Sequence, residues 1–221
     1  MAVNRLALFD CDGTLVDSQH TICAAMETCF AAAGLEPPAR ERTRRVVGLS
    51  LVEAMGAMLP EADAETHAAL AEDYKRAFHA MRAQGPIEEP LFDGIADLID
   101  ALEADGWLLG VATGKSDRGL SLCLEAHGLS GRFVTLQTAD RHPSKPHPSM
   151  IHAAMAQAGA GPETTMMIGD TSYDMAMARA AGAMAVGVAW GYHGPDELVA
   201  AGADHIADHP SAIIALTRAL A

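Results

Sequence analysis

The sequence predicts an α/β fold: a doubly wound parallel sheet with an inserted helical domain. Three observations lead to this prediction. Apolar runs of strand length alternate with longer stretches of helical periodicity, which is typical of β-α-β units. One interval, from Leu15 to about Pro90, has helical periodicity only and is too long for a simple crossover. Candidate catalytic residues directly follow several of the apolar runs, at the strand ends where open parallel sheets bind ligands.

The predicted strands are short apolar segments followed by polar or glycine-containing sequence. We expect them at residues 5–9, 107–112, 133–137, 165–169 and 183–188, with a short edge strand at 205–207. Helical periodicity follows most of them, and a last helix is expected after Pro210.

Four helices are predicted between the first two strands, at residues 18–33, 39–47, 51–58 and 62–81. Gly34 and Gly48 stand where glycines commonly end helices. We therefore expect two domains: a core of residues 1–15 and 88–221, and a helical domain of residues 16–87.

The composition restricts the function. The 221 residues include 29 acidic and 15 basic ones, giving a formal net charge of -14. Because nucleic-acid affinity depends on lysine and arginine, this balance argues against a nucleic-acid partner. The start of the chain lacks a secretory signal, and no apolar run is long enough to span a membrane. We expect a cytoplasmic protein without a membrane partner, and the sequence leaves its oligomeric state open.

The segment FDCDGTLVDS is the strongest functional signal. Asp10 and Asp12 alternate, so in a regular strand they would face opposite ways, but Gly13 and Thr14 allow a sharp turn. Such a pair can divide its roles, one carboxylate acting as a metal-bound nucleophile and the other as general acid and base. The alternative is a turn in which these residues make only local hydrogen bonds.

The segment VATGKS follows the second predicted strand. It matches the end of a phosphate-binding P-loop, but that motif requires glycine where this chain has Leu109. We instead expect the Thr113 hydroxyl and the backbone N–H groups at the next helix start, including Gly114, to bind phosphoryl oxygens. Lys115 is predicted to be a solvated side chain.

Two further segments carry candidate charged groups. Prolines stiffen the loop around Lys145 and present its ammonium group, which suits a transferring phosphoryl group. In GDTSYD, Asp170 and Asp174 lie four residues apart at a predicted helix start. Several carboxylates near Asp10 would repel one another without a hard cation, and oxygen ligands suit Mg²⁺. The alternative for Asp170 is a helix cap.

Taken in order, these motifs resemble the haloacid dehalogenase (HAD) superfamily, specifically its phosphatase branch. The resemblance covers nearly the whole chain, and the helical insertion is similar to the cap of phosphoglycolate phosphatase-like members. It implies a Rossmann-like core with a four-helix cap. Dehalogenases of the superfamily lack the second aspartate of the first motif, so Asp12 favours phosphate esters.

The resemblance also implies roles for the motif residues. Asp10 would attack phosphorus to form an aspartyl phosphate, and Asp12 would protonate the leaving oxygen and then activate water. Thr113 and Lys145 would hold the phosphoryl oxygens. The expected ligands of Mg²⁺ are Asp10, the backbone carbonyl of Asp12, Asp170 and, close by, Asp174.

Specificity is expected to come from the helical domain. The segment 47–50, with Gly48 and Ser50, resembles the family's specificity loop. Arg45, the last arginine of the cluster 40–45, is our candidate for a second anionic group of the substrate. The alternative is a solvated helix face with a Glu41–Arg45 pair. Three positions depart from the family pattern: Ser144, where glycine is common, Gly114, where asparagine is frequent, and His20, where a small residue or proline often stands.

We therefore expect a Mg²⁺-dependent phosphomonoester hydrolase for a small phosphorylated metabolite, with 2-phosphoglycolate as the first candidate. Within the superfamily, an inorganic pyrophosphatase, a sugar phosphatase and a β-phosphoglucomutase-like phosphomutase are alternatives. From other classes, the alternatives are a P-loop NTPase, disfavoured by Leu109, and a non-catalytic binding module, disfavoured by the complete catalytic set.

Overall fold

The computed structural model describes residues 4–85 and 87–219. Its strands form one six-stranded parallel sheet of order β3-β2-β1-β4-β5-β6. The strands are β1 (Asn4–Phe9), β2 (Leu108–Thr113), β3 (Thr135–Thr138), β4 (Ala160–Gly169), β5 (Met184–Val188) and β6 (His205–Ala207). All six predicted strands are present, and the α/β fold class is confirmed. The largest difference is β4, which begins five residues before the predicted Thr165. Predicted core residues 1–3 and 220–221, and residue 86, lie outside the described residues.

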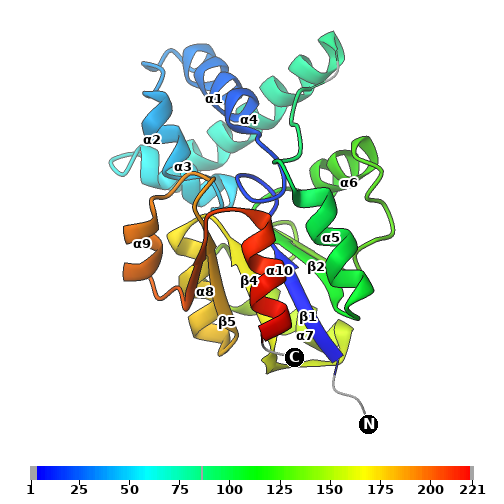
Figure 1. Cartoon of the computed structure of the whole chain (residues 1–221). Helices are drawn as coiled ribbons and strands as arrows, with labels where there is room; N and C mark the ends of the chain where they lie inside the picture. The colour runs from blue at the N-terminus through cyan, green and yellow to red at the C-terminus, as the bar shows by residue number, and fades with distance from the viewer. Residues whose placement is uncertain (1–3, 86, 220–221) are drawn as a thin grey trace.

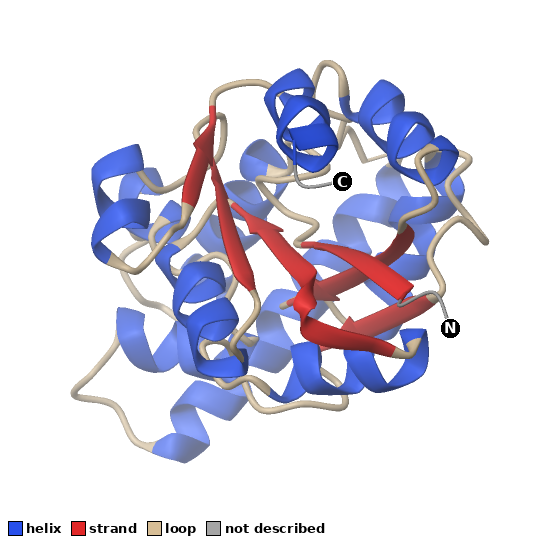
Figure 2. Cartoon of the chain, turned by 60° about the horizontal axis from the view of Figure 1, so that its bottom comes forward, coloured by secondary structure: helices blue, strands red, loops and turns tan. Residues whose placement is uncertain are grey.

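Helices cover both faces of the sheet, as Figure 2 shows. On one face lie α5 (Ile95–Ala104), α6 (Asp117–Ala126) and α10 (Pro210–Ala219); on the other lie α7 (Ser149–Ala158), α8 (Ser172–Ala181) and α9 (Pro195–Ala200). Because strand side chains alternate, Ala7 and Phe9 of β1 pack into the first layer, and Leu6 and Leu8 pack into the second.

A helical unit, defined here as α1 to α4, lies beyond the carboxyl ends of the strands (Figure 1). Its members are α1 (Gln19–Ala32), α2 (Arg40–Arg44), α3 (Leu51–Met58) and α4 (Ala64–Gln84). They enclose a hydrophobic core of their own, which includes Met26, Phe30, Met55, Leu70 and Tyr74. The second helix ends three residues before the predicted Val47, because the chain turns there and Gly48 adopts a φ of 96°.

The two connections to this helical unit run side by side. The N–H of Asp17 donates to the carbonyl of Pro90 (2.8 Å), and Val16 forms an isolated bridge with Leu91. This pairing supports our proposal that residues 16–87 are a separate domain.

The four cysteines are buried and their thiols are free. Among the described residues, no helix combines the length and apolar character needed to cross a bilayer.

Candidate active site

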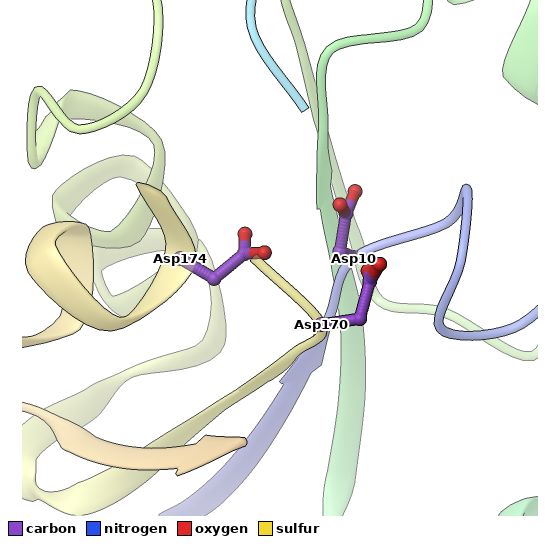
Figure 3. Close-up of side chains that lie close together, drawn as sticks. All are labelled: Asp10, Asp170 and Asp174. Carbon is purple, nitrogen blue, oxygen red and sulfur yellow. The ribbon is translucent and has the colours of Figure 1, made fainter. Parts of the chain in front are cut away.

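Three carboxylates meet at the carboxyl ends of β1 and β4 (Figure 3). Asp10 follows β1, Asp170 follows β4, and Asp174 lies in the first turn of α8. All three are buried, and one oxygen of each lies within 4.8 Å of the others. In this strand order, the β1/β4 boundary is the point where the connections change direction, so the sheet opens a crevice there.

Lys145 is the cation at this cluster. Its buried Nζ lies 3.0 Å from Oδ1 of Asp10 and donates to Oδ1 of Asp174 at 2.7 Å. Burial favours the neutral amine, but the two carboxylates outweigh it and raise the pKa of Lys145. The predicted lysine is therefore brought directly to the first aspartate.

Burial is the main cause that raises the pKa of Asp10, to about 7. Lys145 opposes the rise, whereas the charges of Asp174 and Asp12 add to it. Oδ1 of Asp10 also accepts from the backbone N–H of Cys11 at 2.6 Å. Its Oδ2 is buried and has no hydrogen-bond partner among the described residues.

Asp170 is held on the other side of the cluster. It accepts from the Thr14 hydroxyl (2.8 Å) and from the N–H of Tyr192 (2.9 Å). Burial first, and then the charges of Asp10 and Asp174, raise its pKa well above the ordinary value. Gly13 is required beside it, because an added Cβ would lie 2.2 Å from its carboxylate and Gly13 has a φ of 83°.

Asp170 does not cap α8, so that alternative is wrong. Thr171 is the N-cap: its N–H and hydroxyl both donate to Oδ2 of Asp174, at 3.1 and 2.7 Å. The other oxygen of Asp174 faces Lys145. Asp174 therefore serves both the helix start and the cluster.

The cluster suits a hard divalent cation. It offers only oxygen donors, and its buried charge lacks full compensation from Lys145 alone. The orphaned Oδ2 of Asp10 is a buried acceptor of the kind that a metal ion satisfies. This chemistry fits Mg²⁺ better than metals that prefer nitrogen or sulfur ligands.

Asp12 lies apart from the cluster. Its Oδ1 accepts from the Ser18 hydroxyl at 2.5 Å and forms an ion pair with Lys115. Lys115 also lies 3.3 Å from Glu89, and its side chain is 10% exposed. The prediction that Lys115 is solvated is wrong, because β2 pairs with β1 and carries the following loop against Asp12.

Sequence reasoning missed Lys115 and Glu89 as parts of this site. The segment VATGKS places this lysine directly after a strand, which is typical of a site residue, but nothing in the segment indicates Asp12 as its partner. Nothing in the local sequence around Glu89 indicates its partner.

Thr113 ends β2 at the same edge of the sheet and is buried. Its hydroxyl accepts from the N–H of Lys115 at 3.2 Å. The next residue, Gly114, has no room for a side chain: a Cβ would lie 2.6 Å from the carbonyl oxygen of Leu49. Glycine at this position therefore allows the helical unit to approach the core.

The segment 47–50 contacts the core beside the carboxylate cluster. The N–H of Ser50 donates to the Ser144 hydroxyl, 2.8 Å away, next to Lys145. Gly48 lies against Thr171, where an added Cβ would be 3.3 Å from the hydroxyl oxygen. The predicted specificity segment is thus placed at the site.

Arg45 is placed differently. Its guanidinium pairs with Glu197 of α9 at 2.6 Å, and its carbonyl accepts from the hydroxyl of Tyr173 at 3.1 Å. Glu41 lies 3.9 Å from Arg44, so the expected Glu41–Arg45 pair is wrong. Arg45 therefore joins the helical unit to the core, and its role toward substrate stays a prediction that this ion pair disfavours.

A cavity of about 140 Å³ separates the helical unit from the core next to this site. Asp12, Gly114 and Lys115 border it from the core, and Gly48 borders it from the helical unit. The site thus combines a metal-type carboxylate cluster with a separate, lysine-paired aspartate at a cavity. Together, the parallel sheet and this carboxylate-rich site are typical of an α/β hydrolase.

Comparison with known proteins identifies the family. The model of the haloacid dehalogenase-like hydrolases matches residues 7–188. The chain therefore belongs to the haloacid dehalogenase-like hydrolases, and it is an enzyme of the phosphatase branch, as its relatives' names indicate.

Three relatives illustrate that branch. A protein named probable phosphatase IndB from Dickeya dadantii is 38% identical, over 97% of this chain and 94% of its own length. N-acetylmuramic acid 6-phosphate phosphatase from Pseudomonas aeruginosa is 33% identical, over 98% and 96%. A phosphoglycolate phosphatase from Xylella fastidiosa is 31% identical, over 89% and 85%.

Solved structures agree with the fold. A hydrolase from Pseudomonas syringae superposes with a TM-score of 0.86 at 26% identity, covering 99% of this chain and 100% of its own. A predicted phosphatase from Clostridium acetobutylicum gives 0.87 at 26% identity, covering 98% and 99%.

Proposed function

We propose that this protein is a Mg²⁺-dependent phosphomonoester hydrolase of a small phosphorylated metabolite, acting through an aspartyl phosphate on Asp10. One observation carries the proposal: the two aspartates of the first motif have different surroundings. Asp10 lies in the carboxylate cluster against Lys145, whereas Asp12 is held by Ser18 and Lys115 at the cavity. Carboxylates in separate environments can take separate roles.

In the proposed reaction, Lys145 and Thr113 bind the phosphoryl oxygens, with the backbone N–H of Gly114 as a further donor. A carboxylate oxygen of Asp10 attacks phosphorus, and the bond from phosphorus to the ester oxygen breaks. Asp12 donates its proton to that leaving oxygen, so the alcohol departs neutral. Asp12 then accepts a proton from water, which attacks phosphorus, releases phosphate and regenerates Asp10.

The metal would be held by Asp10, Asp170, the backbone carbonyl of Asp12 and, at its edge, Asp174. When bound, Mg²⁺ supplies positive charge that offsets both the carboxylates and the phosphate dianion. The cluster contains three buried carboxylates, and Lys145 is paired with two of them. One lysine does not balance three negative charges, and this imbalance of charge supports a metal requirement.

We propose 2-phosphoglycolate as the first substrate to test, since several relatives are named phosphoglycolate phosphatases. A sugar phosphatase is a second candidate, favoured by the relative named for N-acetylmuramic acid 6-phosphate. Residues 16–87 would act as the cap that excludes water, with Gly48 and Ser50 near the substrate. The net charge of -14 supports small anions bound locally and not nucleic acid.

The test is phosphate release from a panel of phosphorylated metabolites, with and without Mg²⁺, by the wild type and by Asp10→Asn. We expect Mg²⁺-dependent, sustained release by the wild type and none by Asp10→Asn. The matched control is Asp93→Asn, which changes an exposed aspartate and should retain activity. An active Asp10→Asn enzyme would contradict the covalent mechanism, and transfer to a sugar without sustained release would indicate a mutase.

A further inference from the structure

The cavity between the helical unit and the core is mainly apolar. Its apolar lining comes from α1, α3, α4, α6 and the segment before α3, and includes Ile22, Met26, Val47, Leu51, Phe78 and Leu122. This lining indicates that the adjoining part of the substrate is apolar.

The position of the cavity indicates that the apolar part of the substrate belongs to the leaving group. Asp12 borders the cavity, whereas Asp10 and Lys145 do not. On the proposed mechanism, on which this inference rests, Asp12 must lie within hydrogen-bond reach of the ester oxygen. The group attached to that oxygen therefore extends from Asp12 into the cavity, while the phosphoryl group stays at Asp10.

The size and charge of the cavity further restrict which leaving groups can fit. Its volume of about 140 Å³ is close to that of apolar protein cavities of roughly 150 Å³ that bind benzene. The cationic side chains at the cavity are Lys75, Arg82, Arg118 and Lys115, the last of which is paired with Asp12. Arg82 stacks on Phe78 at 5.7 Å. These cations would repel a positively charged substituent.

We propose that the preferred substrate is a phosphomonoester of an apolar, ring-sized alcohol without positive charge. The glycolate group of 2-phosphoglycolate is too small to cover this lining. It would leave most of the apolar contact unused, and burial of apolar surface is the main source of binding energy that such a cavity offers.

A homologous series of primary alkyl phosphates tests this preference while keeping the chemistry of the leaving oxygen nearly constant. We expect kcat/KM to rise about fourfold per added methylene from ethyl to hexyl phosphate. 2-Phenylethyl phosphate should exceed both ethyl phosphate and 2-phosphoglycolate. 6-Aminohexyl phosphate has the chain length of hexyl phosphate but carries a cation, so its kcat/KM should not show this rise.

Two adjacent positions in α3 provide matched variants. Leu51 lines the cavity, whereas Val52 is 43% exposed and does not. Leu51→Asn should flatten the dependence on chain length, and Val52→Asn should preserve it. Leu122→Asn on α6 is a second cavity variant in case Leu51→Asn folds poorly, as its thermal melting would reveal.

The outcomes separate this inference from the proposed function. Hydrolysis of 2-phosphoglycolate and ethyl phosphate with no gain along the series would overturn the apolar preference and leave the phosphatase intact. An unchanged slope in both cavity variants would also overturn it. No phosphate release from any ester would overturn both proposals.

Discussion

The ammonium group of Lys115 forms a buried ion pair with the carboxylate of Asp12. The same ammonium lies 3.3 Å from Glu89, in the segment through which the chain returns to the core. Burial raises the pKa of Glu89, and Lys115 opposes that rise. One lysine therefore fixes the proposed general acid and ties it to the connection between the helical unit and the core.

Lys115→Met should lower both activity and stability. Removing the cation leaves two buried carboxylates without a compensating charge, which costs about 3 kcal/mol in comparable buried pairs. Urea unfolding measures the loss, and kcat/KM measures the effect on Asp12. Lys75→Met, which breaks the exposed Lys75–Glu72 pair, is the control and should change stability much less. Equal losses of stability in the two variants would contradict this account.

Asp170→Asn should stabilise the metal-free protein and abolish its response to Mg²⁺. Burial and neighbouring carboxylates raise the pKa of Asp170, so its ionised form destabilises the folded state at neutral pH. Thermal melting with and without Mg²⁺ measures both effects. The wild type should melt higher with Mg²⁺ and the variant should not. A variant that keeps the full Mg²⁺ response would exclude Asp170 as a ligand.

Gly114→Ala should lower activity by separating the helical unit from the core. The added methyl group would lie 2.6 Å from the carbonyl oxygen of Leu49, so the segment 47–50 has to move. A displacement of about 1 Å at an active site costs on the order of a hundredfold in rate. Gly194→Ala is the control, because a Cβ there has no neighbour within 4 Å. Wild-type kcat/KM in Gly114→Ala would show that this contact is dispensable.

Arg45→Met distinguishes a structural from a substrate-binding arginine. Because Arg45 pairs with the exposed Glu197, we expect kcat/KM for 2-phosphoglycolate to change less than about fivefold. Glu197→Gln should produce a similar change, since it breaks the same pair. A large rise in KM for Arg45→Met alone would instead restore the predicted contact with an anionic substrate.

The free energy of unfolding should decrease as the pH falls below about 6.5, because His193 is buried in its neutral form. Its Nδ1 accepts from the N–H of Ser172 at 3.1 Å and therefore carries no proton. Burial lowers its pKa below the ordinary 6.5, so acid protonates the unfolded chain first, and stability is lost as the pH falls through the folded pKa.

Urea unfolding at pH 7.5 and 5.5 should therefore show a smaller acid loss in His193→Gln than in the wild type. His209→Gln, at a half-exposed histidine, should leave the acid loss unchanged. An unaltered loss in His193→Gln would assign the acid sensitivity to other groups.

Two of the three departures from the family pattern have a common structural explanation. Gly114 allows the carbonyl of Leu49 to approach, and the Ser144 hydroxyl accepts from the N–H of Ser50. Both unusual residues therefore contact the same segment of the helical unit. Substrate contacts are not needed to explain either of them.

The sequence by itself determined the carboxyl ends of the strands and the candidate catalytic residues. Hydrophobic periodicity and turn residues depend only on residues that are close in the sequence. These patterns are therefore enough to predict that Asp10, Thr113 and Asp170 lie at one edge of a parallel sheet. It also predicted the helical insertion, because no strand pattern interrupts residues 16–87.

Only the tertiary structure decided the partners of the charged side chains. Lys115 and Asp12 are 103 residues apart, and Arg45 and Glu197 are 152 apart, so no local pattern indicates either pair. The apolar cavity likewise arises where α1, α3, α4 and α6 converge. Packing of separate elements determines which groups are desolvated together, and that desolvation sets the pairing, the pKa shifts and the chemistry of the cavity.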